Sequence, residues 1–315
     1  MLFSCCKINR RRNSRYRRWN LVHKVKVVAV SLESPKNRMP EQVALITGAA
    51  GGLGSTVARL LSHTHVLVLT DGNPKKLEQF TSSLNREGYR ATAVPGDLTD
   101  PGLHDILAEH CQKAGVLRSI VNAAGLSPAQ ADWQTIVNVN TVAASHLVNT
   151  MEPLLTPGSA CVMIASVAGH LGPVNAEIDT LLDNPHRADL LGALEPLLKK
   201  LTAIHGGTRE GHAYSLSKRA VIRLCECQSL NWGKKGARII SISPGVLSTA
   251  MGRLEAKRGD RAQALINSTP AARWGNAMDV AKAAEFLLSD AASYITGCDF
   301  RVDGGAVAAL RGRTF

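Results

Sequence analysis

From residue 43 onward, short apolar runs rich in β-branched residues alternate with longer segments, such as 103–114 and 131–155, whose apolar residues recur at helical spacing. The short runs lack strict alternation of apolar and polar positions, which is typical of strands covered by helices on both faces. Strands and helices in alternation predict an α/β fold with a doubly wound parallel sheet, a Rossmann fold. The seven predicted strands are 43–47, 65–70, 91–96, 118–124, 160–166, 237–243 and 298–304.

A leucine-rich block at residues 181–201 departs from this alternation. The sequence Asp183-Asn184-Pro185 predicts the start of a helix, because a capping residue precedes proline. Pro196 interrupts the apolar stripe, which favours a kinked helix or two short helices over one straight helix. We expect a helical insertion over about 170–211. Its apolar stripe consists of Leu190, Leu191, Leu194, Leu197, Leu198 and Leu201.

This stripe must be covered by other apolar surface, and two interpretations are open. In the first, it packs beside the long helices of the domain and changes how subunits pair. In the second, it lines the substrate cleft and selects an apolar ketone or alcohol. The two interpretations are compatible.

The positive charge is concentrated at the amino-terminal end. Residues 1–38 contain 11 Lys and Arg against the single acid Glu33, whereas the other 277 residues carry 26 basic and 24 acidic side chains. A basic leader of this kind is a dispensable extension, a targeting segment or a nucleic-acid-binding arm. We expect the first of these, with a single domain over 39–315, because the first strand follows Met39 almost at once. The nearly neutral domain argues against a nucleic-acid partner.

Other features of the composition indicate a cytoplasmic protein. No apolar run reaches the roughly 18–20 residues of a membrane-spanning helix, so no membrane partner is expected. The seven cysteines form no Cys-x-x-Cys pattern, and Cys225 and Cys227 would point to opposite sides of a helix. An odd number of scattered cysteines favours reduced thiols in the cytosol, and no metal site is predicted.

Glycines at 48, 52 and 54 follow the first predicted strand and precede a helix. Side chains there would keep a pyrophosphate from the backbone N–H groups at the helix N-terminus. A tight turn alone would explain the glycines, but an acid at the end of the next strand, Asp71, strengthens the prediction of a dinucleotide site. A carboxylate there can accept from both ribose hydroxyls and repels a 2′-phosphate, which favours NAD over NADP. The nearby Lys75 and Lys76 weaken that inference.

Several motifs in order resemble the short-chain dehydrogenase/reductase family over nearly all of 39–315. Asn122-Ala123-Ala124-Gly125 resembles the motif that follows the fourth strand in this family. Asp132-Trp133 and Val139-Asn140 resemble the helix that carries a catalytic Asn in this family. Ser166, Tyr214-x-x-x-Lys218 and Pro244-Gly245 with Thr249 complete the set. The position of the insertion and the sequence of the last residues are similar to the bacterial 3α-hydroxysteroid dehydrogenase/carbonyl reductase subgroup. That resemblance implies an NAD-dependent enzyme acting on steroids and other bulky carbonyl compounds.

The catalytic set that the resemblance implies is Asn140, Ser166, Tyr214 and Lys218. A phenol normally titrates near ~10, and a lysine one helical turn away would lower that pKa, so that Tyr214 acts as general acid/base. Ser166 would orient the substrate oxygen, and Asn140 would hold a water beside Lys218. Taken singly, each has a structural alternative: a surface Tyr/Lys pair, a capped turn, or an Asn that satisfies buried backbone.

The remaining expectations concern the cofactor, the substrate and the assembly. A secondary alcohol such as a cyclic diol is the alternative substrate, and a non-catalytic cofactor-binding regulator is the alternative function. We expect a homodimer or homotetramer. The segment 250–265 is predicted to be a partly solvated substrate lid. The implied NAD-binding residues are Gly48, Gly52, Leu53, Gly54, Asp71, Asp97, Leu98, Asn122, Ala123, Gly125, Tyr214, Lys218, Pro244, Gly245 and Thr249.

Overall fold

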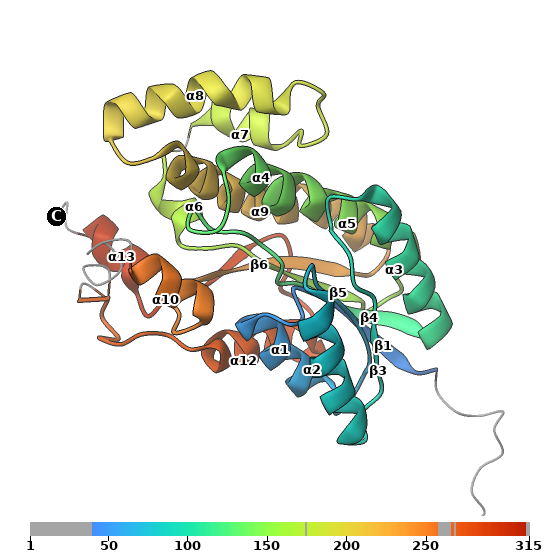
Figure 1. Cartoon of the computed structure of the whole chain (residues 1–315). Coiled ribbons are helices and arrows are strands. Elements are labelled where there is room, and N and C mark those ends of the chain that lie inside the picture. Colours follow the sequence, from blue (N-terminus) through green and yellow to red (C-terminus); the bar gives the residue numbers. More distant parts are fainter. Residues whose placement is uncertain (1–39, 174, 258–265, 268, 313–315) are drawn as a thin grey trace, which may run out of the picture. The chain divides into compact units, whose positions relative to one another are not determined.

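Seven parallel strands form one sheet in the order β3-β2-β1-β4-β5-β6-β7 (Figure 1). The computed structural model describes residues 40–173, 175–257, 266–267 and 269–312, which belong to one unit, Pro40–Phe315. All seven predicted strands and the doubly wound fold are confirmed. The strands are β1 (Gln42–Thr47), β2 (Val66–Thr70), β3 (Ala91–Ala93), β4 (Val116–Asn122), β5 (Ala160–Ile164), β6 (Arg238–Pro244) and β7 (Asp299–Val302).

Helices connect the strands and cover the sheet. The first half of the unit has α1 (Gly52–Leu61), α2 (Pro74–Arg86), α3 (Pro101–Ala114), α4 (Trp133–Val137), a π-helical segment (Asn138–Ala143), α5 (Ala144–Met151) and a 3₁₀ turn (Glu152–Leu154). The second half has α6 (Ala168–Leu171), α7 (Ala176–Leu182), α8 (Leu190–His205), α9 (Arg209–Lys234), α10 (Ala250–Ala256), α12 (Ala277–Leu288), a 3₁₀ turn (Asp290–Ala292) and α13 (Ala306–Arg311).

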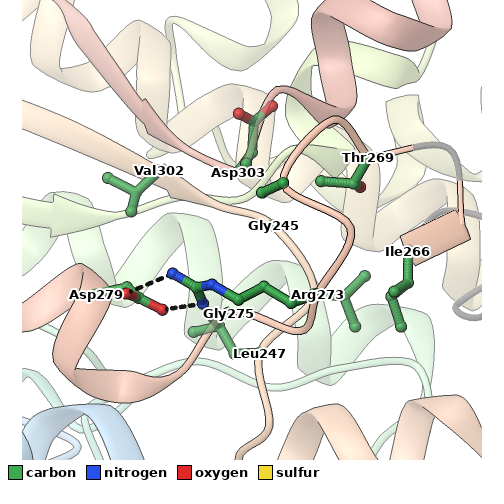
Figure 2. Close-up of a pocket in the computed structure, with 12 residues that line it drawn as sticks. Gly245, Leu247, Ile266, Thr269, Arg273, Gly275, Asp279, Val302 and Asp303 are labelled. Carbon is green, nitrogen blue, oxygen red and sulfur yellow. Dashed lines mark hydrogen bonds and ion pairs between the residues drawn. The ribbon is translucent and has the colours of Figure 1, made fainter.

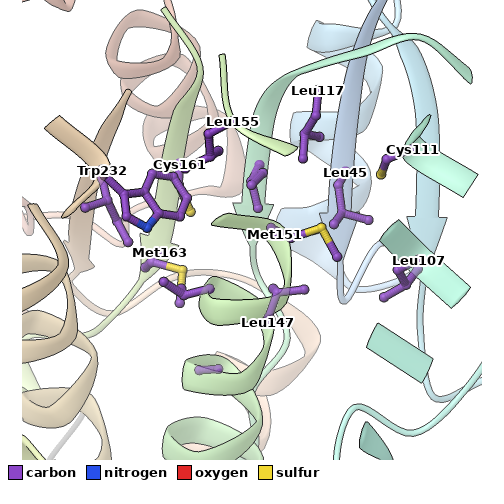
Figure 3. Close-up of a cluster of buried hydrophobic side chains, with 14 of the residues drawn as sticks. Leu45, Leu107, Cys111, Leu117, Leu147, Met151, Leu155, Cys161, Met163 and Trp232 are labelled. Atoms are coloured by element: carbon purple, nitrogen blue, oxygen red, sulfur yellow. The ribbon is translucent and has the colours of Figure 1, made fainter. Parts of the chain in front are cut away.

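Alternate residues of the strands supply two separate cores. Leu45 of β1 faces a cluster formed with α3, α5 and α9, and Figure 3 shows it with Leu107, Met151 and Trp232. Its neighbour Ile46 belongs to the other cluster, with α1, α2 and α12. Because successive strand side chains point to opposite faces, both must be apolar when helices cover both faces. This explains the unbroken apolar runs in the sequence.

The sheet order reverses between β1 and β4, which lie side by side although β2 and β3 intervene in the chain. The connections after these two strands therefore leave in opposite directions and open a crevice at the carboxyl ends of the strands. The glycine turn after β1 and the Asn122 motif at the end of β4 meet there. The sheet topology thus positions the dinucleotide site that the motifs predict.

The leucine stripe is buried within the chain. Leu194 and Leu198 are 1% and 0% exposed and pack with Trp133 of α4 and Leu216 of α9, among others. Figure 1 shows α8 and α7 lying along the group formed by α4 and α9. These contacts support the first interpretation, packing against the long helices.

One detail of the predicted insertion is wrong, and one of the two alternatives at Pro196 is excluded. Asn184 and Pro185 lie in turns, and the helices begin at Ala176, capped by Asn175, and at Leu190. Pro196 does not divide the stripe into two helices, because α8 continues from Leu190 to His205 through it. Burial of leucines on both sides of the proline stabilises the helix against the loss of one backbone hydrogen bond.

Two ion pairs hold the insertion to α9. Arg219 donates two hydrogen bonds to Asp179, at 2.9 and 2.7 Å, and Arg223 donates two to Asp183 at the same distances. Paired bonds of this kind fix orientation as well as distance. The start of the insertion is therefore anchored independently of the leucine stripe.

The structure bears on two other sequence-based expectations. Among the residues it describes, no helix is both long and apolar enough to cross a bilayer. The interpretations of the basic leader concern residues 1–38, which lie outside the described part of the chain. The predicted lid is described only in part, as α10, since residues 258–265 are not described.

Candidate active site

The turn between β1 and α1 has no room for side chains. Gly48 has a φ of +62°, and a Cβ on it would lie 2.7 Å from the backbone nitrogen of Ala124. Helix α1 follows with Gly51 as its N-cap, and no side chain caps it. The first N–H groups of the helix, at Gly52, Leu53 and Gly54, are therefore available for an anion. The turn fits the pyrophosphate of a dinucleotide.

Asp71 is tied directly to this turn. One carboxylate oxygen accepts from the backbone N–H of Ala50 at 3.0 Å, and the other accepts from Asn73 at 2.9 Å. Asn73 caps the N-terminus of α2, so Asp71 is not the cap of that helix. Each oxygen has a further lone pair available, so the carboxylate can still accept from hydroxyl groups.

Asp97 and Leu98 follow β3, at the same edge of the sheet. The exposed Asp97 accepts from the backbone N–H of Thr99 at 2.9 Å, which closes a turn. The carbonyl of Leu98 is bonded to His104 at 2.8 Å. Gly96 donates to the backbone oxygen of Asp71 at 3.3 Å, which brings this turn beside the acid at the end of β2.

The motif at the end of β4 is locked to β1 through Thr47. Its hydroxyl donates to the side chain of Asn122 at 2.5 Å and accepts from the backbone N–H of Ala124 at 3.2 Å. Ala123 donates to the backbone oxygen of Thr47 at 3.3 Å. These bonds fix the backbone of the residues just before Gly125, in the predicted cofactor site.

Asn140 lies in the π-helical segment, and both N–H groups and the oxygen of its amide are hydrogen-bonded. Its oxygen accepts from the backbone N–H of Leu126 at 2.8 Å, and its nitrogen donates to the Leu126 carbonyl at 2.9 Å and to Ser217 at 3.1 Å. Ser217 in turn donates to the backbone oxygen of Tyr214 at 2.8 Å. Asn140 thus satisfies buried backbone, as its structural alternative stated, and also braces the helix that carries Tyr214. Its role in holding a water stays a prediction.

Ser166, Tyr214 and Lys218 are brought together as predicted. The Ser166 side chain lies close enough to the Tyr214 phenol to lower its pKa, and the ammonium of Lys218 lies 5.8 Å from the centre of the Tyr214 ring. Lys218 is 5% exposed and donates to the carbonyl of Ile164, at the end of β5, at 2.9 Å. A Cβ on Gly125 would lie 3.2 Å from both the Lys218 ammonium and the amide oxygen of Asn140. The four predicted catalytic residues therefore form one constellation.

The protonation states differ from the sequence-based expectation. Burial raises the pKa of the Tyr214 phenol, the bond with Ser166 acts against this, and the charge of Glu255 raises the pKa further. Burial lowers the pKa of Lys218 to about 8. The net pKa of Tyr214 is raised because removal from water disfavours the phenolate more than its neighbours favour it, and the lowering effect of Lys218 stays a prediction.

Glu255 is a residue that the motifs did not reveal. It lies in α10, accepts from the backbone N–H of Ala129 at 3.0 Å, and its charge acts on Tyr214. The contact fastens α10 to the loop that follows β4. A lone glutamate 41 positions after the tyrosine carries no signal in the sequence, apart from its place in the predicted lid.

Pro244, Gly245 and Thr249 lead from β6 to α10. Pro244 accepts from the backbone N–H of Val167 at 3.1 Å, which sets this loop beside Ser166. The hydroxyl of Thr249 caps α10 by accepting from the N–H of Gly252 at 3.2 Å, and its methyl group would lie 3.3 Å from a Cβ on Gly52. Thr249 therefore adjoins the glycine turn across the crevice.

A cavity of about 210 Å³ lies beside this loop. Figure 2 shows residues that line it. Gly245, Leu247 and Asp303 line it, and Arg273 and Asp279 form an ion pair at one side. Neither Ser166 nor Tyr214 is part of its lining. The cavity thus adjoins the active site without being the place where hydride and proton are transferred.

Comparison with known proteins identifies the family. Residues 42–177 match the family described as short chain dehydrogenase, and residues 199–307 match that described as enoyl-(acyl carrier protein) reductase. The short-chain dehydrogenase/reductase bsc3 of Alternaria brassicicola is 32% identical over 273 residues, which cover 85% of this chain and 97% of that protein. The chain belongs to the short-chain dehydrogenase/reductase family. As a member of this family, it is an oxidoreductase that acts on CH–OH groups with a nicotinamide cofactor.

Other short-chain dehydrogenases resemble this one more distantly. Gluconate 5-dehydrogenase of Gluconobacter oxydans is 26% identical, with 85% of this chain and 95% of that protein covered. The crystal structure of a glucose/ribitol dehydrogenase-type member from Brucella melitensis covers 84% of this chain and 96% of its own, with 24% identity and a TM-score of 0.66. This likeness confirms the fold.

Proposed function

We propose that the protein transfers a hydride between NAD(H) and a secondary alcohol or its ketone, with Tyr214 as the proton donor and acceptor. The observation that carries the proposal is the placement of Ser166 and of the buried Lys218 ammonium beside the Tyr214 phenol. Hydride transfer to a carbonyl needs one positioned proton donor, and a phenol can supply it. The nicotinamide, when bound, supplies or accepts the hydride.

In ketone reduction the Tyr214 phenol gives its proton to the developing alkoxide. Ser166, beside the same phenol, donates to the substrate oxygen and holds it toward Tyr214. The raised pKa of Tyr214 favours the protonated phenol, which is the form that donates a proton in carbonyl reduction. Oxidation needs the phenolate and becomes faster as the pH rises.

The cofactor is NAD in this proposal. The bond between the carboxylate of Asp71 and the Ala50 N–H puts a negative charge next to the glycine turn. A 2′-phosphate would bring a second negative charge to that carboxylate, whereas a ribose hydroxyl would donate to it. Lys75 and Lys76, which would favour a phosphate, are exposed.

For the substrate we propose a bulky hydrophobic alcohol or ketone such as a hydroxysteroid, from the resemblance of the insertion and the last residues. The leucine stripe no longer supports this class, because it packs against α4 and α9. A specific observation favours the alternative of a cyclic diol: Glu255 places a carboxylate near Tyr214, where it could accept from a second hydroxyl. Relatives such as gluconate 5-dehydrogenase carry the names of hydroxylated substrates.

The test is a screen of steroid, cyclic-diol and aliphatic alcohols with NAD and NADP, run with the wild type and Tyr214→Phe. We expect Tyr214→Phe to lose at least about a thousandfold in turnover while still binding NADH, measured by NADH fluorescence. Tyr294→Phe is the matched control, because Tyr294 is fully exposed. A near-normal rate in Tyr214→Phe would rule out the mechanism. NADH binding without turnover on any compound would favour the non-catalytic regulator.

We further propose a homodimer or homotetramer in the cytoplasm. Free thiols at Cys111, Cys161 and Cys225 are buried, and those at Cys227 and Cys298 are exposed, as suits a reducing compartment. Light scattering on the purified protein measures the assembly, and a monomer at micromolar concentration would refute it. Imaging of the tagged full chain tests the location.

A further inference from the structure

Helix α6 carries the residues just after Ser166 and consists of a single turn, Ala168–Leu171. The N–H of Ala168 donates to the hydroxyl oxygen of Ser166 at 3.2 Å, and the N–H of Gly169 donates to its backbone oxygen at 3.0 Å. A hydroxyl oxygen that accepts from one N–H must direct its own proton and its remaining lone pair elsewhere. The placement of α6 therefore determines where the Ser166 hydroxyl points.

A helix of one turn depends on other elements for its position. It has too few backbone hydrogen bonds to offset the cost of ordering it. Its first contact is with α9, where a Cβ on Gly169 would lie 2.9 Å from the backbone of both Lys218 and Arg219. A contact at one point limits the distance between two helices but does not fix the rotation of either. A second contact must therefore hold α6.

His170 supplies the second contact through a buried carboxylate. Its Nε2 donates to Oδ2 of Asp299 in β7 at 2.8 Å, and the two side chains are 15% and 7% exposed. The other carboxylate oxygen accepts from the hydroxyl of Ser241 at 2.6 Å and from that of Ser243 at 2.9 Å, both fully buried in β6. Arg311 adds a hydrogen bond of 3.1 Å to the backbone oxygen of His170. The sheet thus holds Asp299, and Asp299 holds α6.

We infer that His170 and Asp299 are positioning residues for the reaction and that they act through Ser166. The contacts run from the two serines of β6 to Asp299, then to His170, and then along α6 to the Ser166 hydroxyl. The pair sets the direction in which Ser166 donates, and so the orientation of the substrate oxygen before Tyr214. This role rests on the proposed function of Ser166. A misplacement of about 1 Å in an active site can cost about a hundredfold in rate.

The first test needs neither cofactor nor substrate. Full-length protein is labelled with ¹³C at tyrosine Cζ, whose NMR frequency reports the surroundings of the phenol oxygen, and the Tyr214 signal is the one lost in Tyr214→Phe. We expect Ser166→Ala to shift this signal and His170→Leu to shift it in the same direction. Ser166→Ala combined with His170→Leu should shift it no further than Ser166→Ala alone. His170→Gln, whose amide N–H can take the place of Nε2, should restore the wild-type frequency.

The second test is turnover with NADH and the ketone from the screen that the wild type reduces fastest. We expect kcat to fall about a hundredfold in Ser166→Ala and about tenfold in His170→Leu. The double variant should lose about a hundredfold, whereas independent effects would multiply to about a thousandfold. NADH binding should be unchanged in all three. Leu198→Ala is the matched control, because it weakens a core that does not include α6 and should leave kcat and the Tyr214 signal unchanged.

Two results would overturn the role of the pair while leaving that of Ser166 intact. One is an unmoved Tyr214 signal with normal kcat in folded His170→Leu, as a purely structural residue would give. The other is a loss in the double variant equal to the product of the single losses. If His170→Leu fails to fold, Asp299→Asn takes its place, because it keeps the size of the side chain and removes the carboxylate. A Tyr214 signal that ignores Ser166→Ala would instead contradict the proposed role of Ser166, and the role of His170 with it.

Discussion

Lys218 combines burial with a positive charge, and replacing it by methionine should stabilise the protein while inactivating it. The side chain is 5% exposed, and burial lowers the pKa of its ammonium from 10.5 to about 8. Within the described part of the chain, its ammonium donates one hydrogen bond, to the carbonyl of Ile164. A charged group with so little compensation destabilises the folded state, and methionine matches its length without the charge.

The size of the effect follows from the shift in pKa. Each unit corresponds to about 1.4 kcal/mol, so the ammonium costs the folded state about 3 kcal/mol at pH 7. Loss of the bond to Ile164 offsets about 1 kcal/mol of this. We therefore expect Lys218→Met to raise the free energy of unfolding by about 2 kcal/mol at pH 7.

The dependence on pH has a definite sign. Between pH 8 and 10.5 the folded lysine has lost its proton while the unfolded lysine keeps it, so the unfolded state binds more protons. The free energy of unfolding of the wild type should consequently rise through this window, by about 3 kcal/mol from this residue. Lys218→Met lacks that rise.

The assay is urea unfolding of both proteins at pH 7 and pH 10, at one protein concentration. Lys234→Met on the same helix is the control, because Lys234 is exposed and should leave the pH dependence unchanged. The reasoning would be refuted if Lys218→Met were destabilised by more than about 1 kcal/mol at pH 7. It would also be refuted if the variant kept the pH dependence of the wild type.

Three other substitutions test the cofactor site, the lid and the insertion. Asp71→Ala should shift the ratio of kcat/KM for NAD over NADP at least about tenfold toward NADP, and an unchanged ratio would mean that another residue sets the preference. Glu255→Gln keeps an acceptor for the Ala129 N–H but removes a charge that raises the pKa of Tyr214, so the pH profile of alcohol oxidation should move to lower pH; an unmoved profile would contradict this. Leu198→Ala should lower the free energy of unfolding by about 2–5 kcal/mol with kcat unchanged, because Leu198 is fully buried away from the catalytic residues. A cost below about 1 kcal/mol in urea unfolding would mean that the stripe is not a core.

The parts of the fold that local sequence determines were predictable. The strands were found because both of their faces are buried, which leaves a continuous apolar run, and the turn at Gly48 because only glycine fits its conformation and its contact with Ala124. Tyr214 and Lys218 were found because residues four apart share one face of a helix. Each of these signals lies within a few residues of the chain.

The parts that failed depend on contacts between distant segments. The pKa of Tyr214 is set mainly by burial, which a spacing of four residues does not reveal. Glu255 reaches the site because α10 returns to the loop after β4. The start of the insertion is set by the Asn175 cap and the Asp179–Arg219 pair rather than by the proline at 185. Sequence patterns give no distance between such segments.

The position of the insertion between Ser166 and Tyr214 is tolerated because those residues do not depend on the chain between them. Helix α6, just after Ser166, packs directly on α9: a Cβ on Gly169 would lie 2.9 Å from the backbone of both Lys218 and Arg219. That close approach of two backbones fixes Ser166 against Tyr214 whatever the loop between them contains. The insertion then packs on α4 and α9 through its own leucines and ion pairs, and it adds a polar cavity bordered by Asn140. A chain can therefore lengthen here without disturbing the catalytic geometry.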